Sequence, residues 1–126
     1  MSRVLDTSAI LAFIWREPGG ERVARHLETA AVSPVIIVEV VSKLIDRGIG
    51  EEAAELAFRS LSLNAVEFDT RQALKAAGLR ERTRRLDISL ADRACMALAL
   101  VNGMPVMTGD RVWASLGLDV EVELIR

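Results

Sequence analysis

Short apolar stretches alternate with longer segments of mixed polarity along the chain, which is the pattern of strands alternating with helices. Val4-Leu5 and the segment from Met104 to Met107 are expected to be short strands, and each leads into a turn that contains an aspartate. Another short strand is expected near 65–68. From Leu118 to Leu124 apolar and acidic residues alternate strictly, which predicts a half-exposed edge strand. This order predicts an α/β domain with a parallel sheet.

Helical periodicity and end signals place helices between these strands. The clearest helix covers 90–102, where apolar residues at 90, 94, 97, 98 and 101 share one face that is expected to be buried. Ser33 and Pro34 are typical of the first positions of a helix, which is expected to run to Arg47. The other helices are expected at 9–16, 21–29, 51–60, from Asp69 to the Arg-rich segment around 80–85, and at 111–116.

The composition narrows the class of protein. The 126 residues are 51% apolar, enough for a single domain over 1–126 with a core of its own. The single cysteine, Cys95, excludes an internal disulfide and a cysteine-built zinc site, so a reducing cytoplasm is expected. No apolar run approaches the roughly 20 residues of a membrane span, and Asp6 interrupts the N-terminal apolar stretch, so no signal peptide is expected. The net charge of −2 argues against a general polyanion-binding protein.

Four acidic residues stand out by their positions. Asp6 and Asp110 follow apolar strands, and parallel sheets bind their ligands at the carboxyl ends of strands. Asp92 lies in the first turn of the helix that precedes the Asp110 strand, and Glu39 is the one charge within 34–42. If these carboxylates meet at one edge of the sheet, they offer the oxygen ligands that Mg²⁺ or Mn²⁺ prefers.

Each of these acids also has an ordinary structural role open to it. Asp6 and Asp110 could be helix N-caps, and Asp92 could complete a capping box with Ser89. Glu39 could be a solvated residue that pairs with a lysine one turn further along its helix. The sequence therefore leaves a capping or surface role open for each acid beside the metal-binding role.

The segments that carry the four acids resemble the PIN-domain ribonucleases. In its length and in the sequence of these segments, the chain is most similar to the VapC-type toxins of toxin–antitoxin pairs. The resemblance covers the whole chain in order, and no single motif is specific by itself. It is carried by Val4-Leu5-Asp6-Thr7-Ser8-Ala9, by Ser33 to Val40 with its Glu39, by Ile88 to Ala99 with its Asp92, and by Val106-Met107-Thr108-Gly109-Asp110.

The resemblance implies a three-layer α/β/α sandwich with a parallel sheet of about five strands, and a single PIN-like nuclease domain. It implies a metal-dependent endoribonuclease that cleaves RNA phosphodiesters by metal-activated water, with one or two Mg²⁺ or Mn²⁺ ions, acting as the toxin of a toxin–antitoxin pair. A cognate antitoxin and a homodimer are implied as partners. The implied catalytic and metal-binding positions are Asp6, Glu39, Asp92 and Asp110, and the implied pocket hydroxyls are Thr7, Ser8 and Thr108.

Basic residues near the acids are expected to contact the RNA phosphates, because the planar guanidinium of arginine matches the geometry of a phosphate group. These expected contacts are Lys43, Arg47, Arg85, Arg93 and Arg111. The arginine run at 80–85 fits an ordinary solvated loop equally well. Asp87 is an additional acid near the site, for which a turn or helix-entry role is favoured. The chain has only five aromatic residues and no tyrosine, so no platform of aromatic side chains for stacking RNA bases is expected.

Other readings stay open. A housekeeping PIN-type RNA-processing nuclease and a non-catalytic α/β binding module with an acidic pocket are both compatible with the residues. A phosphoacceptor receiver domain fits less well, because it needs a lysine at the end of a late strand and the only lysines are Lys43 and Lys75. The apolar faces 9–15 and 35–45, with Trp15 and Trp113, exceed the needs of one small core and favour a partner surface.

Overall fold

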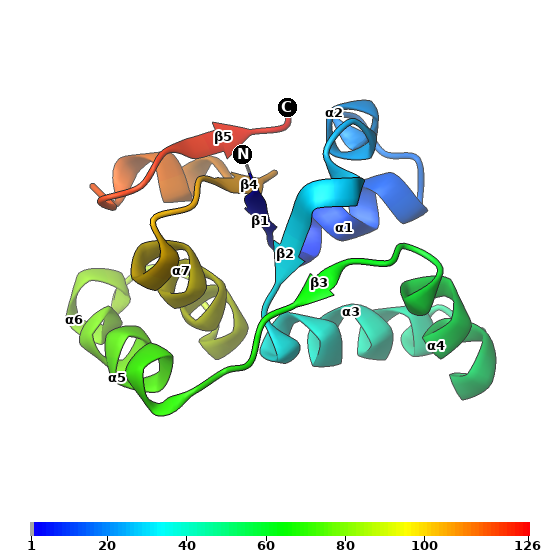
Figure 1. The fold of residues 1–126 in the computed structure, drawn as a ribbon, viewed down its shortest axis with the longest axis horizontal. Coiled ribbons are helices and arrows are strands. Elements are labelled where there is room, and N and C mark those ends of the chain that lie inside the picture. The colour runs from blue at the N-terminus through cyan, green and yellow to red at the C-terminus, as the bar shows by residue number, and fades with distance from the viewer. Residues whose placement is uncertain (1) are drawn as a thin grey trace.

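A five-stranded parallel sheet runs through the computed structural model, which describes residues 2–126 (Figure 1). The strand order is β3-β2-β1-β4-β5, so the first strand lies at the centre and the last strand at one edge. Val4 stands opposite Ala31 on one side and Val106 on the other. The strands are β1 (Arg3–Leu5), β2 (Ala30–Val32), β3 (Asn64–Ala65), β4 (Val106–Thr108) and β5 (Val122–Leu124).

Helices cover both sides of the sheet and complete a three-layer α/β/α sandwich, which confirms the expected fold class. In Figure 1 α5, α6 and α7 lie on one side of the central strands and α1 and α2 on the other. The helix α3 contacts both α1 and α7. The helices are α1 (Thr7–Ile14), α2 (Gly20–Ala24), α3 (Pro34–Asp46), α4 (Glu51–Arg59), α5 (Thr70–Gly78), α6 (Arg80–Thr83) and α7 (Leu90–Asn102), with 3₁₀ turns η1 (Leu27–Thr29) and η2 (Arg111–Ser115).

The two helices with the strongest local signals are confirmed. The Ser33 hydroxyl accepts a hydrogen bond from the Val35 N–H, and Pro34 is the first residue of α3. After α3, Gly48 takes a left-handed conformation with φ of +99°, which a glycine adopts without strain. The helix α7 covers 90–102 as expected, but Leu90 is 61% exposed, whereas its neighbour Ala91 is buried in the core.

Several expected boundaries are wrong. The expected helix 21–29 is broken into α2 and the turn η1, because Val23 is the one large apolar side chain that α2 buries and the chain must return to β2 at Ala30. The helix that begins after Asp69 ends at Gly78, and the arginine-rich segment continues as the separate helix α6. The helix expected at 111–116 is a 3₁₀ helix. The strand expected near 65–68 covers only Asn64–Ala65. The strand expected in the tail covers only Val122–Leu124.

The core lies between the sheet and the two helices α1 and α7. Val4 and Leu5 of the central strand are fully buried, as are the residues from Ala94 to Ala99 on α7. Trp113 is 1% exposed and belongs to this core, so the expectation that it contributes to a surplus partner surface is wrong. Among the described residues, no helix is long and apolar enough to cross a bilayer.

The contact between α1 and α2 depends on the absence of a side chain at Gly20. A Cβ atom built there would lie 2.5 Å from the carbonyl oxygen of Ala12, which is closer than non-bonded atoms can approach. By contrast, a Cβ atom at Gly78, in the last turn of α5, would meet no atom within 4 Å.

We therefore expect Gly20→Ala to lower the free energy of unfolding by about 1–3 kcal/mol, because α1 and α2 must move apart. Gly78→Ala is the matched control, and it should leave stability equal or raise it by about 0.5–1 kcal/mol because alanine favours the helix. Urea denaturation of both variants measures the difference. Equal stability of the two variants would contradict the close packing of α1 on α2.

Candidate active site

Asp6 lies at the carboxyl end of the central strand β1 and caps the N-terminus of α1. The residue is only 3% exposed, yet its carboxylate is well supplied with donors. Its Oδ1 accepts a hydrogen bond of 2.8 Å from the Ala9 N–H and one of 2.7 Å from the Ser8 hydroxyl. Its Oδ2 accepts a hydrogen bond of 2.5 Å from the Thr108 hydroxyl at the end of β4. The carboxylate thus links two neighbouring strands and the first helix.

Burial raises the pKa of Asp6 to about 6, and this is the largest influence on the group. The hydrogen bonds from Thr108, Ala9 and Ser8 act in the opposite direction, and the charge of Asp92 adds a smaller upward contribution to the pKa. Mutual repulsion among the acids is therefore secondary to the loss of solvation at this position.

Asp92 combines a capping box with a place at the same edge of the sheet. Its Oδ2 accepts a hydrogen bond of 3.0 Å from the Ser89 N–H, and its own N–H donates to the Ser89 hydroxyl at 3.1 Å. The structural role considered for Asp92 is therefore confirmed, and its Oδ1 accepts no hydrogen bond from the described residues. Burial is the main cause that raises the pKa of Asp92, and the nearby charges of Glu39 and Asp110 add to it.

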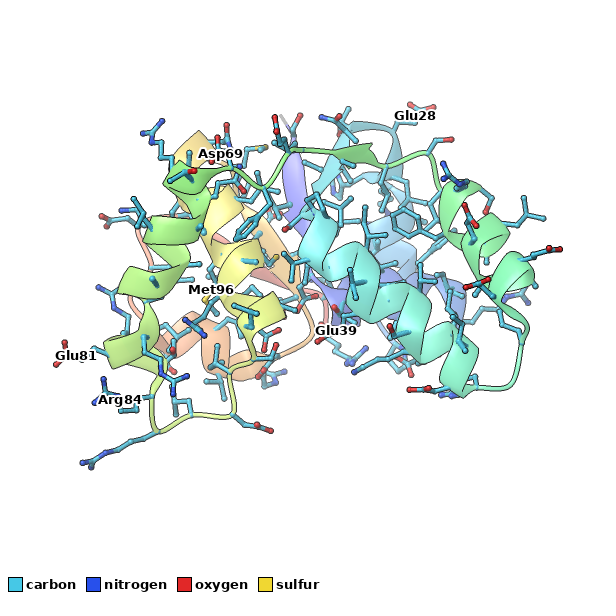
Figure 2. All side chains as sticks on the ribbon, turned by 90° about the horizontal axis from the view of Figure 1, so that it is seen from below. Glu28, Glu39, Asp69, Glu81, Arg84 and Met96 are labelled. Carbon is cyan, nitrogen blue, oxygen red and sulfur yellow. The ribbon has the colours of Figure 1, made fainter. Side chains whose placement is uncertain are left out.

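Asp110 and Glu39 complete the set of four acids. Asp110 caps η2 through a 3.0 Å hydrogen bond from the Val112 N–H to its Oδ1, and its own N–H donates to the Thr108 hydroxyl. Glu39 is half-buried on α3, and its carboxylate accepts no hydrogen bond from the described residues. Figure 2 shows Glu39 between the helices α3 and α7.

All four acids line one open pocket of about 380 Å³, although they come from four separate segments of the chain. Of the expected hydroxyls, Thr7 and Ser8 also line this acidic pocket, and Thr108 lies beneath it as a donor to Asp6. The Ser8 hydroxyl also accepts a hydrogen bond of 2.8 Å from the Gly109 N–H, which ties α1 to the turn after β4. The remaining lining residues are Leu11, Trp15, Glu17, Lys43, Asp87 and Ser89.

Two further acids line this pocket. Asp87 lines it, although a turn residue was the favoured interpretation, and Glu17 lines it without having been considered. Glu17 directly precedes a Pro-Gly-Gly break, where nothing in the sequence marks it as different from other surface acids. Six acids therefore face one lysine, Lys43, around this pocket.

The donor set fits a hard divalent cation that keeps part of its water shell. Among residues 2–126, no three His, Cys, Asp or Glu side chains stand close enough to enclose an ion by themselves. Mg²⁺ is commonly held by one or two carboxylates and several waters, so a complete protein cage is not needed. Cys95 is not a competing soft ligand, because it is buried, its thiol points to the Leu5 carbonyl, and burial raises its pKa well above the usual value.

Comparison with known families gives a match to the PIN domain over residues 3–117. The chain belongs to the PIN domain family. A search of curated proteins found none that matches.

Solved structures share the fold of this PIN domain over nearly the whole chain. VapBC2 from Rickettsia felis, bound to a DNA fragment from their promoter, is 18% identical with a TM-score of 0.78, and the match covers 98% of each chain. DNA-bound VapBC from Salmonella typhimurium is 18% identical with a TM-score of 0.77 and full coverage (100%) of both chains. VapBC-5 from Mycobacterium tuberculosis, described as a member of the VapBC family of toxin–antitoxin systems, is 22% identical with a TM-score of 0.64 and coverage of 99% of this chain and 98% of that one.

The basic residues expected to contact RNA are placed unequally in this PIN domain. Lys43 lines the acidic pocket, and the Arg47 guanidinium lies over the ring of Trp15, which also lines it. Arg85 and Arg111 are exposed and are not among the lining residues. Arg93 donates from its Nη1 to the Ala76 carbonyl of α5 at 3.2 Å, and its expected contact with RNA stays a prediction.

The raised pKa of Asp6 predicts a definite pH dependence for the metal-free protein. Between pH 4 and pH 6 the folded state holds a proton that the unfolded state, with a pKa of 3.8, has already lost, so stability falls as pH rises through this range. Above pH 6 the full penalty is present, and its upper limit is about 3 kcal/mol. Denaturant unfolding at several pH values in EDTA measures it.

Asp6→Asn is expected to remove this pH-dependent loss of stability, because the variant buries no charge at this position. The asparagine amide oxygen can still accept the hydrogen bond from the Ala9 N–H. The stability of Asp6→Asn relative to wild type should therefore increase from pH 4 to pH 6 and then stay constant. Parallel pH profiles of the two proteins would show that Asp6 is not the buried acid that the structure describes.

Proposed function

We propose that this PIN domain is a metal-dependent endoribonuclease that hydrolyses RNA phosphodiester bonds and acts as the toxin of a toxin–antitoxin pair. The observation that carries the proposal is the gathering of Asp6, Glu39, Asp92 and Asp110 around one open pocket at the carboxyl ends of β1 and β4. Their role as catalytic and metal-binding residues, within a single nuclease domain over 1–126, is part of the proposal.

One or two Mg²⁺ or Mn²⁺ ions held by these acids would lower the pKa of a water molecule and neutralise charge on the scissile phosphate. The rest of the chemistry is supplied by the chain. Asp6 is fixed by three donors, so it offers a rigid carboxylate at the base of the pocket. The oxygens of Asp92 and Asp110 that their caps leave unused can orient the attacking water and accept its proton.

No histidine base is required by this arrangement. His26 lies at a different hollow, beside Arg22 and Arg25, and it does not line the acidic pocket. A carboxylate with a raised pKa, as burial produces at Asp92, is a better proton acceptor near neutral pH than an ordinary one. The acids therefore suffice for water activation.

An acidic pocket repels an RNA phosphate until a cation is present, so basic residues must bring the strand to its rim. Lys43 lines the pocket. Four exposed arginines lie between α5 and Asp87, namely Arg80, Arg82, Arg84 and Arg85. Figure 2 shows Arg84 of this group reaching into solvent. These exposed cations can attract a polyanion locally, although the net charge of the protein is −2.

The toxin role is supported by family membership and by the nature of the structural neighbours. Each match covers 98–100% of this chain and of one chain in a VapBC structure. We therefore propose a cognate antitoxin as partner, a homodimer as the assembly, and the cytoplasm as the compartment.

Purified protein free of antitoxin is expected to cleave total RNA in Mg²⁺ or Mn²⁺ and to stop when EDTA is added. Asp92→Asn should lower the cleavage rate by at least about 100-fold, because an unused carboxylate oxygen is lost from the pocket. Gel analysis of the RNA fragments measures both effects. If no RNA is cut by the wild-type protein in either metal, the chain is a non-catalytic binding module instead.

The same variant separates the catalytic role of Asp92 from its capping role. Without metal, Asp92→Asn should be as stable as wild type or more stable at pH 7, since the amide oxygen still accepts the Ser89 N–H and no charge is buried. Ser89→Ala removes the acceptor for the Asp92 N–H, so it should lower the free energy of unfolding by about 1 kcal/mol. A thermal melt in which Asp92→Asn is the less stable of the two would favour a purely structural role for Asp92.

A further inference from the structure

A tryptophan and an arginine are stacked at the rim of the acidic pocket. Trp15 directly follows α1, is half-buried, and lines the pocket together with Glu39 and Lys43. Arg47 directly follows α3, and its guanidinium carbon lies 3.8 Å from the centroid of the Trp15 ring. The ends of two helices therefore place a flat cation on a flat aromatic surface beside the acids.

The Arg47 guanidinium is held by the ring and by no carboxylate. The guanidinium makes no ion pair or hydrogen bond with any described residue, and the residue as a whole is exposed. Stacking on an aromatic face keeps the guanidinium plane oriented while one face and its N–H groups remain open to solvent. A side chain held in this way loses less freedom when a ligand binds than a solvated one does.

Trp15 is also distinguished from the other aromatic residues. Trp113 is 1% exposed in the core, and Phe58 lies in the groove between α3 and α4. Among the residues that the structure describes, Trp15 is the one aromatic side chain that lines the acidic pocket. The small number of aromatics in the sequence gave no reason to expect stacking here, because their count does not show where they lie.

We propose that the Trp15–Arg47 stack is a platform for an unpaired base of a single-stranded RNA, next to the phosphate that is cut. The proposal rests on the proposed function and adds to it two residues that would hold a base of the substrate. Unpaired bases stack on aromatic rings and on arginine planes, whereas the bases of a duplex are already stacked on each other. Because every base has a flat face, the platform selects single strands without reading a particular base.

Intrinsic fluorescence tests this directly, because the chain has two tryptophans in very different places. Wild-type protein in EDTA is titrated with a short single-stranded RNA and, separately, with a duplex of the same sequence. The single strand should quench the emission and the duplex should not. Trp15→Phe should lose the quenching, since the remaining Trp113 is buried in the core.

Binding of the same labelled RNA, followed by fluorescence anisotropy in EDTA, separates stacking from simple charge. Arg47→Lys keeps the charge but not the plane, so it should weaken binding about 10-fold, nearly as much as Arg47→Gln. Arg25→Gln removes one exposed charge from the end of α2 and is the matched control, with binding expected within about twofold of wild type. Thermal melts establish that each variant is folded.

The outcomes distinguish this inference from the proposed function. Wild-type affinity in Arg47→Lys, or quenching that persists in Trp15→Phe, overturns the platform, even where metal-dependent cleavage is intact. Quenching and stacking-dependent binding without any cleavage in Mg²⁺ support the platform and overturn the nuclease. Absence of binding to single-stranded RNA by wild-type protein in EDTA overturns the platform, and the nuclease is tested separately by cleavage in Mg²⁺.

Discussion

The Asp6 carboxylate is buried, with only 3% of the residue exposed, and it accepts hydrogen bonds from the first helix and from the last residue of β4. The Ser8 hydroxyl binds Asp6 and accepts the Gly109 N–H, so the same contacts that satisfy the charge also join β1 to β4. These donors do not fully replace water, and the pKa of Asp6 stays raised to about 6. A bound cation would relieve that remaining cost, which links the stability of the fold to the chemistry of the pocket.

Capping and metal binding are often weighed as alternatives, but a carboxylate has two oxygens and can serve both. Asp92 uses Oδ2 in its capping box and Asp110 uses Oδ1 to cap η2, and in each the second oxygen accepts no hydrogen bond from the described chain. The cap fixes the side chain by a hydrogen bond to backbone, so the unused oxygen is held in place. The helix ends thus preorganise the pocket.

The sequence predicted the parallel sheet, α3, α7 and the four acids, because these depend on local periodicity, on cap residues and on the resemblance of short segments. It failed where the tertiary context decides. The helix expected over 21–29 is interrupted because the chain must reach β2. The positions of Glu17 and of the Trp15–Arg47 stack follow from how α1 and α3 end in space, which no local pattern encodes.

The central claim is that these acids form a cation site, and anomalous X-ray diffraction from crystals grown with Mn²⁺ tests it most directly. A peak is expected inside the acidic pocket, bound by one or more of Asp6, Glu39, Asp92 and Asp110 and completed by water. Crystals of the Asp92→Asn protein should show a weaker peak at the same place. Ordered pocket side chains with no anomalous peak between them at millimolar Mn²⁺ would contradict the account.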